Sequence, residues 1–185
     1  MTSSFTLSLP DWVTSFLAGQ PAVFADLNSR MKLAVTLSSL NIEHQTGGPF
    51  GAAIFDIAAG TLIAAGVNIV VPGKCSLAHA EMVAIALAQK ILDTHDLGSQ
   101  GTYQLVTSCE PCAMCLGAIP WSGVKSLVCG ARGEDAEAIG FDEGAKPDNW
   151  IDHLHRRGIE TTCDILRQQA AEVLNRYGAK GGIRY

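Results

Sequence analysis

Two short segments about thirty residues apart constrain the fold of this chain more than any other feature. The first is His79-Ala80-Glu81, and the second is Pro111-Cys112-Ala113-Met114-Cys115. One imidazole and two thiolates can hold a Zn²⁺ ion on three sides and leave the fourth position open for water, which is the coordination of a catalytic rather than a structural site. The fold must therefore bring both segments to one point.

Glu81 lies two residues after the histidine, so it can face the same ion without binding it. A carboxylate in that position can take a proton from an activated water and deliver it to a substrate. The order His-x-Glu followed by Pro-Cys-x-x-Cys is the signature of zinc-dependent deaminases. We therefore expect Zn²⁺ as the cofactor, Glu81 as the catalytic acid and base, and three metal ligands: His79, Cys112 and Cys115.

Each of these residues also has a simpler explanation when it is taken alone. The two motif cysteines fit a redox dithiol, part of a structural zinc knuckle or two buried hydrophobic side chains, and His79 fits a core histidine. A structural zinc site needs a fourth protein ligand, and the nearest candidate, Cys109, ends a predicted strand and should point elsewhere. A redox dithiol needs neither His79 nor Glu81. The combination therefore favours a catalytic zinc site.

Length and composition predict a single globular domain, because 185 residues suffice for one hydrophobic core and 48% of them are apolar. Pro10 and Asp11 interrupt the start of the chain, so we expect no signal peptide. The most apolar stretch, residues 61–71, is too short to span a bilayer. The six cysteines then indicate reduced thiols and a cytoplasmic location. A net charge of −5 argues against nucleic-acid and membrane partners.

Hydrophobic periodicity predicts strands that alternate with helices, and hence an α/β layered domain. The predicted helices cover residues 11–40 with a break near 19–21, and residues 79–92, 111–119, 150–157 and 165–177. The predicted strands cover residues 51–57, 61–71, 102–107 and 124–129. A loop is expected at 134–148 and a glycine-rich tail at 178–185. The single domain, 1–185, would thus have N-terminal helices in about residues 1–40, a catalytic core in about 48–145, and C-terminal helices and a tail in about 146–185.

Both metal-binding segments fall at predicted helix starts. Pro111 suits the first turn of a helix, because an N–H group there has no intrahelical partner. Cys112 and Cys115 are three residues apart and so face the same side of that helix, and the positive end of the helix dipole favours their thiolates. Two helix starts placed side by side over a sheet would therefore gather three ligands and Glu81 around one ion.

At this point the chain resembles the cytidine deaminase superfamily, and most closely its guanine deaminase branch. The resemblance covers roughly residues 30 to 145, and four segments carry it: 107–121 (TSCEPCAMCLGAIPW), 48–52 (GPFGA), 78–81 (AHAE) and 140–143 (GFDE). It implies a three-layer α/β/α fold with a mixed sheet of about five strands. It also implies a homodimer.

The same resemblance suggests which side chains bind the substrate. Asn68 matches a pocket asparagine whose amide both donates and accepts, and so can fix the orientation of a purine. Phe50 matches an aromatic ring that stacks on the base, and Trp121 matches a pocket wall. Some members of the branch place a C-terminal tyrosine in an active site, sometimes that of the partner subunit, and this chain has Tyr185. The alternatives are a turn asparagine, a core phenylalanine and ordinary packing at a helix end.

Glu143 bears most directly on the choice of substrate. Guanine presents its N1–H and 2-amino groups as adjacent donors, and a carboxylate accepts two parallel hydrogen bonds well. The guanine branch has an acidic residue after Gly-Phe-Asp, and here it is Glu143. The alternative is a solvated acidic loop, because Glu134, Asp135, Glu137 and Asp142 lie nearby in the sequence.

These residues imply the hydrolytic deamination of a small purine, guanine, to xanthine and ammonia. Glu81 would move protons from water to ring N3 and, with Glu143, to the leaving amino group. A tRNA adenosine deaminase is an alternative, but residues 151–185 carry six Lys or Arg against four Asp or Glu, a weakly basic balance. Deamination of cytosine, cytidine or a triazine such as ammeline, and a catalytically silent zinc-binding protein, remain further alternatives.

Overall fold

A mixed sheet of five strands forms the centre of the computed structural model, which describes residues 6–185. The strands are β1 (Gly51–Asp56), β2 (Leu62–Val67), β3 (Tyr103–Cys109), β4 (Ser126–Ala131) and β5 (Glu160–Thr162). They lie in the order β2-β1-β3-β4-β5. The pairs β1–β2 and β1–β3 are antiparallel, whereas β3–β4 and β4–β5 are parallel. The predicted mixed sheet of about five strands is confirmed.

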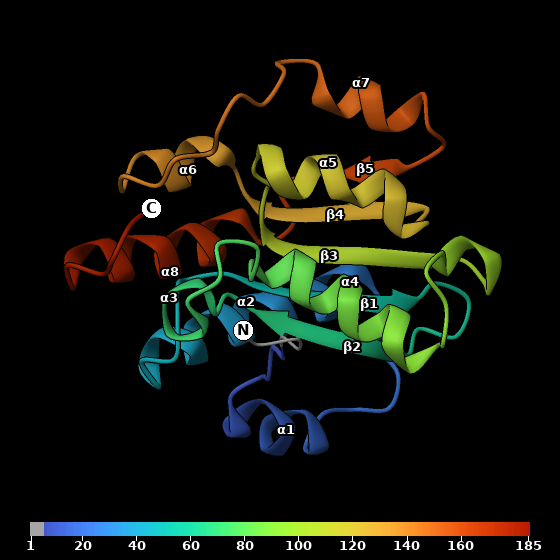
Figure 1. Ribbon diagram of the computed structural model, residues 1–185, viewed down its shortest axis with the longest axis horizontal. Helices are drawn as coiled ribbons and strands as arrows, with labels where there is room; N and C mark the ends of the chain where they lie inside the picture. Colours follow the sequence, from blue (N-terminus) through green and yellow to red (C-terminus); the bar gives the residue numbers. More distant parts are fainter. Residues whose placement is uncertain (1–5) are drawn as a thin grey trace, which may run out of the picture.

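Helices cover both faces of this sheet. They are α1 (Asp11–Ala18), α2 (Leu27–Glu43), α3 (Val70–Gly73), α4 (Ala80–Ile91), α5 (Ala113–Ser122), α6 (Gly133–Glu137), α7 (Trp150–His155) and α8 (Arg167–Ala179), with a short 3₁₀ turn η1 (Leu97–Ser99). Helices α4 and α5 lie on the near face in Figure 1, and α2 and α8 pack on the far face. The three-layer α/β/α arrangement is therefore confirmed.

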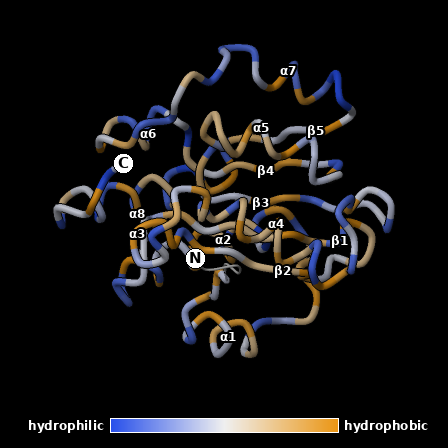
Figure 2. Tube along the Cα trace, in the orientation of Figure 1, coloured by the Kyte–Doolittle hydropathy of each residue, from blue (hydrophilic) through white to orange (hydrophobic). Residues whose placement is uncertain are grey.

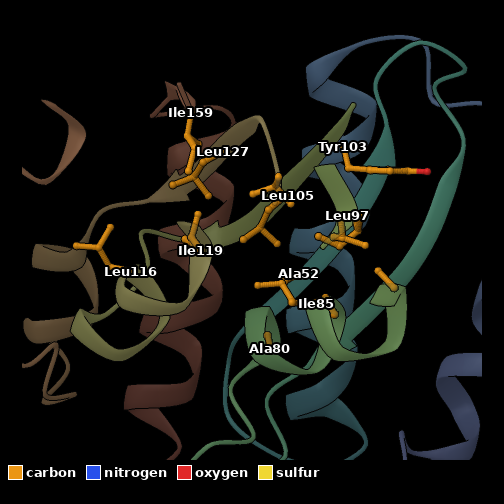
Figure 3. Close-up of a cluster of buried hydrophobic side chains, with 14 of the residues drawn as sticks. Ala52, Ala80, Ile85, Leu97, Tyr103, Leu105, Leu116, Ile119, Leu127 and Ile159 are labelled. Carbon is orange, nitrogen blue, oxygen red and sulfur yellow. The ribbon is translucent and has the colours of Figure 1, made fainter. Parts of the chain in front are cut away.

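Alternation along the strands divides the core between the two faces, because successive strand residues point in opposite directions. On β1, Ala52 and Ile54 face α4 and α5, and Ala53 and Phe55 face α2. Figure 3 shows the first of these clusters, in which Leu105 of the central strand lies among side chains of α4 and α5. Figure 2 shows that the hydrophobic residues concentrate on the strands and that the connection between α6 and α7 is largely hydrophilic.

A glycine on β2 allows α4 to approach the sheet closely. A Cβ atom on Gly66 would collide with the main-chain oxygen of Ala80 and lie 2.6 Å from the amide nitrogen of Ala84. The first turn of α4 therefore rests directly on the strand, because only glycine leaves room for it. This contact fixes the start of α4, where His79 and Glu81 lie.

Several element boundaries differ from the sequence prediction. The predicted strand 61–71 ends at Val67, and Pro72-Gly73 lie in the short helix α3. The predicted loop 134–148 begins inside the five-residue helix α6, which spans Gly133–Glu137. The edge strand β5 was not predicted, because its three residues are exposed or half-buried and lack a hydrophobic alternation. Pro111 precedes α5 and does not lie in its first turn, since Cys112 is the N-cap residue.

The predicted division of the chain begins in residues 1–5, which lie outside the described part. From residue 6 onward, the N-terminal helices α1 and α2 end at Glu43, and the C-terminal helices α7 and α8 follow Lys146. Within residues 6–185, no helix has both the length and the hydrophobicity that crossing a membrane requires.

Candidate metal centre and active site

Three potential metal ligands meet where α4 and α5 begin. His79 is the N-cap residue of α4 and Cys112 is the N-cap residue of α5, and both have extended backbones. The ligand atoms of His79, Cys112 and Cys115 all lie within 4.8 Å of one another. The Sγ atom of Cys112 lies 3.6 Å from Nδ1 of His79. One imidazole and two sulfurs at this spacing match the donor set that suits Zn²⁺.

The two cysteines differ in their protonation. A hydrogen bond from the Cys115 thiol, a further one from His79 and the N–H of Cys115 together lower the pKa of Cys112 to about 4, against the effect of burial. The hydrogen bond to Cys112 and burial raise the pKa of Cys115. Burial opposes a charged His79, but the hydrogen bond with Cys112 and the nearby Glu81 raise the pKa of His79 overall. One thiolate is therefore ready to bind a cation, and the other must lose a proton to do so.

Glu81 lies in the first turn of α4 and lines the same cavity as His79 and Cys112. Its carboxyl group is buried, and this burial raises the pKa of Glu81, although the neighbouring His79 opposes the shift. A carboxyl group whose pKa is shifted toward neutrality can both accept and return a proton at cellular pH. The geometry therefore places a buried carboxyl group beside the metal-ligand set, and its role as the catalytic acid and base stays a prediction.

A small cavity of about 20 Å³ adjoins these groups. Residues from five separate parts of the chain line it: Phe50, His79, Glu81, Glu110, Cys112, Phe141, Asp142, Glu143 and Tyr185. Phe50, Glu143 and Tyr185 were predicted from the sequence as substrate-binding residues, and the structure brings all three to the metal ligands. Their roles in binding stay predictions. Glu110, Phe141 and Asp142 also line the cavity but were not predicted as site residues. Their position next to the motif residues Cys112 and Glu143 is the sequence feature that could have identified them.

Asn68 lies at the end of β2 and contacts this site through its side chain, which is 1% exposed. Its Oδ1 accepts hydrogen bonds from the Tyr185 hydroxyl at 2.6 Å and from the N–H of Val70 at 3.3 Å. Its Nδ2 is buried and has no hydrogen-bond partner within residues 6–185. A buried donor without a partner is costly, so this amide is free to donate to a ligand, and its role in binding stays a prediction.

Glu143 carries the second buried polar atom of this site that has no partner in the described part of the chain. This atom is Oε2, and the side chain is 7% exposed. Burial and the nearby Cys112 raise the pKa of Glu143 to about 8, although Lys146 lowers it. The main-chain oxygen of Glu143 accepts a hydrogen bond from the N–H of Ala113 at 2.9 Å, which ties this residue to the start of α5.

Aromatic rings form the remaining wall. Phe141 lies at their centre, with its ring centroid 4.9 Å from that of Phe50 and 5.6 Å from that of Tyr185. The Tyr185 ring in turn lies 6.2 Å from the His79 ring. The sequence left open which subunit receives Tyr185, and here it occupies the pocket of its own chain. The tail thereby fills space next to the metal ligands, which explains the small free volume.

The structure does not bring Trp121 to this pocket. Its side chain is 83% exposed in the last turn of α5, about 13 Å along the helix from Cys112. It lines a different groove, of about 260 Å³, together with Pro120, Pro147 and Arg157. Cys109 points away from the metal ligands, as predicted, because its thiol donates to the main-chain oxygen of Arg132 at 3.4 Å.

Comparisons with known proteins agree with this geometry. The family model for the cytidine and deoxycytidylate deaminase zinc-binding region matches residues 25–131. Guanine deaminase of Bacillus subtilis is 43% identical over 113 residues, which cover 61% of this chain and 69% of that protein. The structure of guanine deaminase from Nitrosomonas europaea superposes with a TM-score of 0.91 at 49% identity, covering 97% of this chain and 98% of that one.

A further solved structure, which contains 2,6-diaminopurine, is 49% identical with a TM-score of 0.93, and covers all of this chain and 98% of its own. The match to the family model spans more than half of the residues, and it includes both metal-binding segments. The chain therefore belongs to the cytidine and deoxycytidylate deaminase family, and within it to the guanine deaminase branch.

Proposed function

We propose that this chain is a zinc-dependent hydrolase that converts guanine to xanthine and ammonia. The observation that carries the proposal is a pair of buried polar atoms without hydrogen-bond partners among residues 6–185, Nδ2 of Asn68 and Oε2 of Glu143, beside the metal-ligand set. Both atoms would gain partners from a purine. The purine ligand in the 49%-identical structure supports the same class of substrate.

Each edge of guanine has a counterpart in this pocket. The Glu143 carboxylate would accept hydrogen bonds from the adjacent N1–H and 2-amino groups. These two donors would favour its ionised form, which a pKa of about 8 otherwise disfavours. The Asn68 amide would donate from Nδ2 to an acceptor on the purine, because its Oδ1 is already engaged by the Tyr185 hydroxyl. Phe50 and Phe141 provide apolar ring surface for the base. Adenine and cytosine lack adjacent donors in the pattern that Glu143 would accept.

Zinc is the cofactor that the donor set fits, and His79, Cys112 and Cys115 would hold it. When bound, Zn²⁺ supplies a water activated for attack at neutral pH. Glu81 is the residue that moves the protons of this water. It takes one and delivers it to ring N3, and it passes the other, with Glu143, to the 2-amino group. The oxygen bonds to C2, the bond from C2 to the amino nitrogen breaks, and ammonia leaves.

We also propose that the chain forms a homodimer and acts in the cytoplasm. The exposed Trp121 and the groove beside it offer an apolar surface that a second copy would cover. The six cysteines are all free thiols, which supports a reducing compartment. Sedimentation velocity on the chain and on Trp121→Glu would test the dimer, and a wild-type monomer would overturn it.

The deamination itself is tested by ammonia release from purified, zinc-loaded protein. The substrates are guanine, adenine, cytosine, cytidine, ammeline and tRNA, with xanthine identified chromatographically as the product from guanine. We expect guanine to have the highest kcat/KM. If guanine releases no ammonia while another substrate does, the proposed substrate is wrong, and if none does, the protein is not a deaminase of these compounds.

A further inference from the structure

Segment 141–146 connects α6 to α7 without regular secondary structure, yet it carries Glu143. Phe141 and Glu143 are buried and Lys146 is half-buried, whereas the remaining three residues are exposed. The segment therefore contacts the rest of the protein through a few side chains. Because Glu143 must meet two donors of the purine at hydrogen-bond distance, these contacts decide how accurately the pocket is shaped.

The first contact is a main-chain bond from the N–H of Ala113 to the oxygen of Glu143, at 2.9 Å. A tight turn follows, in which Gly144 has a φ of +69° and donates from its N–H to Oδ1 of Asp142 at 2.8 Å. This geometry favours glycine, because other residues are strained at such a φ. The bond and the turn place the backbone of Glu143, but neither one restrains its side chain.

The second contact is an ion pair between Lys146, three residues after Glu143, and Glu110. Nζ of Lys146 lies 3.0 Å from Oε2 of Glu110, and each side chain is 14% exposed. Glu110 is itself fixed, because its Oε2 accepts the N–H of Gly133 at 3.2 Å and its own N–H donates to Ala131 at 2.8 Å. It directly precedes the segment Pro111-Cys112. Lys146 is thus bound to the part of the chain that leads into the metal ligands.

Glycine at position 133 lets these side chains converge. A Cβ atom there would lie 2.8 Å from Nζ of Lys146, 3.6 Å from Oε2 of Glu110 and 3.8 Å from Cγ of Glu143. The stem of Glu143 and the ion pair therefore surround the same glycine. Removing Lys146 would take a charged group away from the surroundings of Glu143. It would also break the ion pair that joins segment 141–146 to Glu110, which directly follows β3.

We propose that the Lys146–Glu110 ion pair holds Glu143 at a fixed position relative to the metal ligands, which makes Lys146 a positioning residue for the purine. Lys146 touches no reacting atom and acts through Glu143. The inference rests on the proposed function, because it assumes that Glu143 binds the substrate. It adds a second, electrostatic link between the recognition loop and the metal-binding segment.

The test compares Lys146→Met with Lys146→Arg. The control is Lys125→Met, which makes the same change at an exposed lysine just before β4, whereas Lys146 lies near Gly133, just after β4. For Lys146→Met we expect kcat/KM for guanine to fall about 100-fold, mainly through KM, the size of effect that a misplacement of about 1 Å produces. Zinc content should stay at one per chain. Lys146→Arg should recover most of the loss, because a guanidinium can bind Glu110. Lys125→Met should match the wild type.

If Lys146→Met does not fold, the double variant Glu110→Gln/Lys146→Met removes the pair without leaving an unpaired buried charge. It should show the same rise in KM. A wild type that deaminates guanine together with a folded Lys146→Met of unchanged KM would overturn this inference alone. An equal loss in Lys146→Met and Lys146→Arg would also overturn it, because the ion pair would then not matter. A wild type inactive on guanine would instead overturn the proposed function, and this inference with it.

Discussion

The two walls of the pocket are built in different ways. On one wall, His79, Glu81 and the motif cysteines sit at the starts of α4 and α5, which pack on the central strands of the sheet. On the other wall, Glu143 lies in an irregular loop and Tyr185 lies in the tail that follows α8. Figure 1 shows the green and yellow-green starts of α4 and α5, the orange loop and the red tail at the same, left-hand end of the sheet.

This difference separates the chemistry of the site from its recognition. Moving a metal ligand would require moving a helix start against a buried strand, as the contact between Gly66 and Ala80 shows. Moving Glu143 would require the loss of a few local contacts, such as the one between its main chain and Ala113. The metal-ligand wall is therefore constrained by the core, whereas the recognition wall is held by fewer contacts in irregular segments.

The largest expected effect comes from the metal-ligand wall. Glu81→Gln keeps the size of the side chain but removes the proton acceptor, so kcat for guanine should fall by about 10²- to 10⁴-fold. Zinc content should be unchanged, because Glu81 is not a ligand in this geometry. Single-turnover kinetics together with metal analysis would check both expectations. Near-normal turnover in this variant would show that another group moves the protons.

The second prediction concerns the recognition wall. Glu143→Gln replaces a charged double acceptor with an amide that also donates, so kcat/KM for guanine should fall about 100-fold. The matched substrate is 2-aminopurine, which has an acceptor at N1 in place of the N1–H and so suits the glutamine amide. The ratio of kcat/KM between guanine and 2-aminopurine should therefore fall in the variant. An unchanged ratio would mean that Glu143 does not contact the N1 edge.

The same division decided how much of the molecule could be predicted from the sequence. The metal-ligand wall depends on helix starts, and these leave strong local signals, such as Pro111 before Cys112 and the apolar run after Glu81. The alternation of strands and helices predicted an α/β layered domain, whereas the mixed sheet and the three-layer arrangement followed only from the family resemblance. The edge strand β5 could not be predicted, because three residues held by pairing to β4 carry no periodic signal of their own.

Only part of the recognition wall could be predicted from the sequence, because the residues that form it come from distant parts of the chain. Phe141 gave no signal by itself, since its place between Phe50 and Tyr185 depends on how the loop and the tail fold back. The hydrogen bond from Tyr185 to Asn68 joins residues 117 positions apart, which no local pattern reveals. Trp121 was placed by analogy at the pocket, and this chain exposes it on another surface.

A third prediction tests whether the metal-ligand wall is preformed. Cys115 has a raised pKa and is a thiol at neutral pH, so zinc binding must release its proton. Zinc affinity should therefore rise about tenfold for each pH unit between about pH 7 and 8. Cys112, with a pKa of about 4, is already ionised there and adds nothing to the slope. At lower pH, protonated His79 should steepen it, since its pKa is raised above the usual value.

Competition with a chelating zinc indicator across this pH range measures the slope directly. An affinity independent of pH would mean that both sulfurs are ionised before the metal arrives. The division between the two walls would survive that result, but the assignment of one thiol and one thiolate to the metal-free site would be wrong.

The smallest effect should come from the tail. Tyr185→Phe keeps the ring packing against Phe141 and His79 and removes only the hydroxyl that donates to Oδ1 of Asn68. That bond fixes which way the Asn68 amide faces, so its loss should raise KM for guanine by less than about tenfold and leave kcat nearly unchanged. The matched control is Tyr103→Phe. It removes the hydroxyl of a buried tyrosine at the start of β3, whereas the metal-ligand segment follows the end of that strand. A large fall in kcat for Tyr185→Phe would instead place the tail hydroxyl in the chemistry, and the division between a rigid reactive wall and an adjustable recognition wall would fail at this residue.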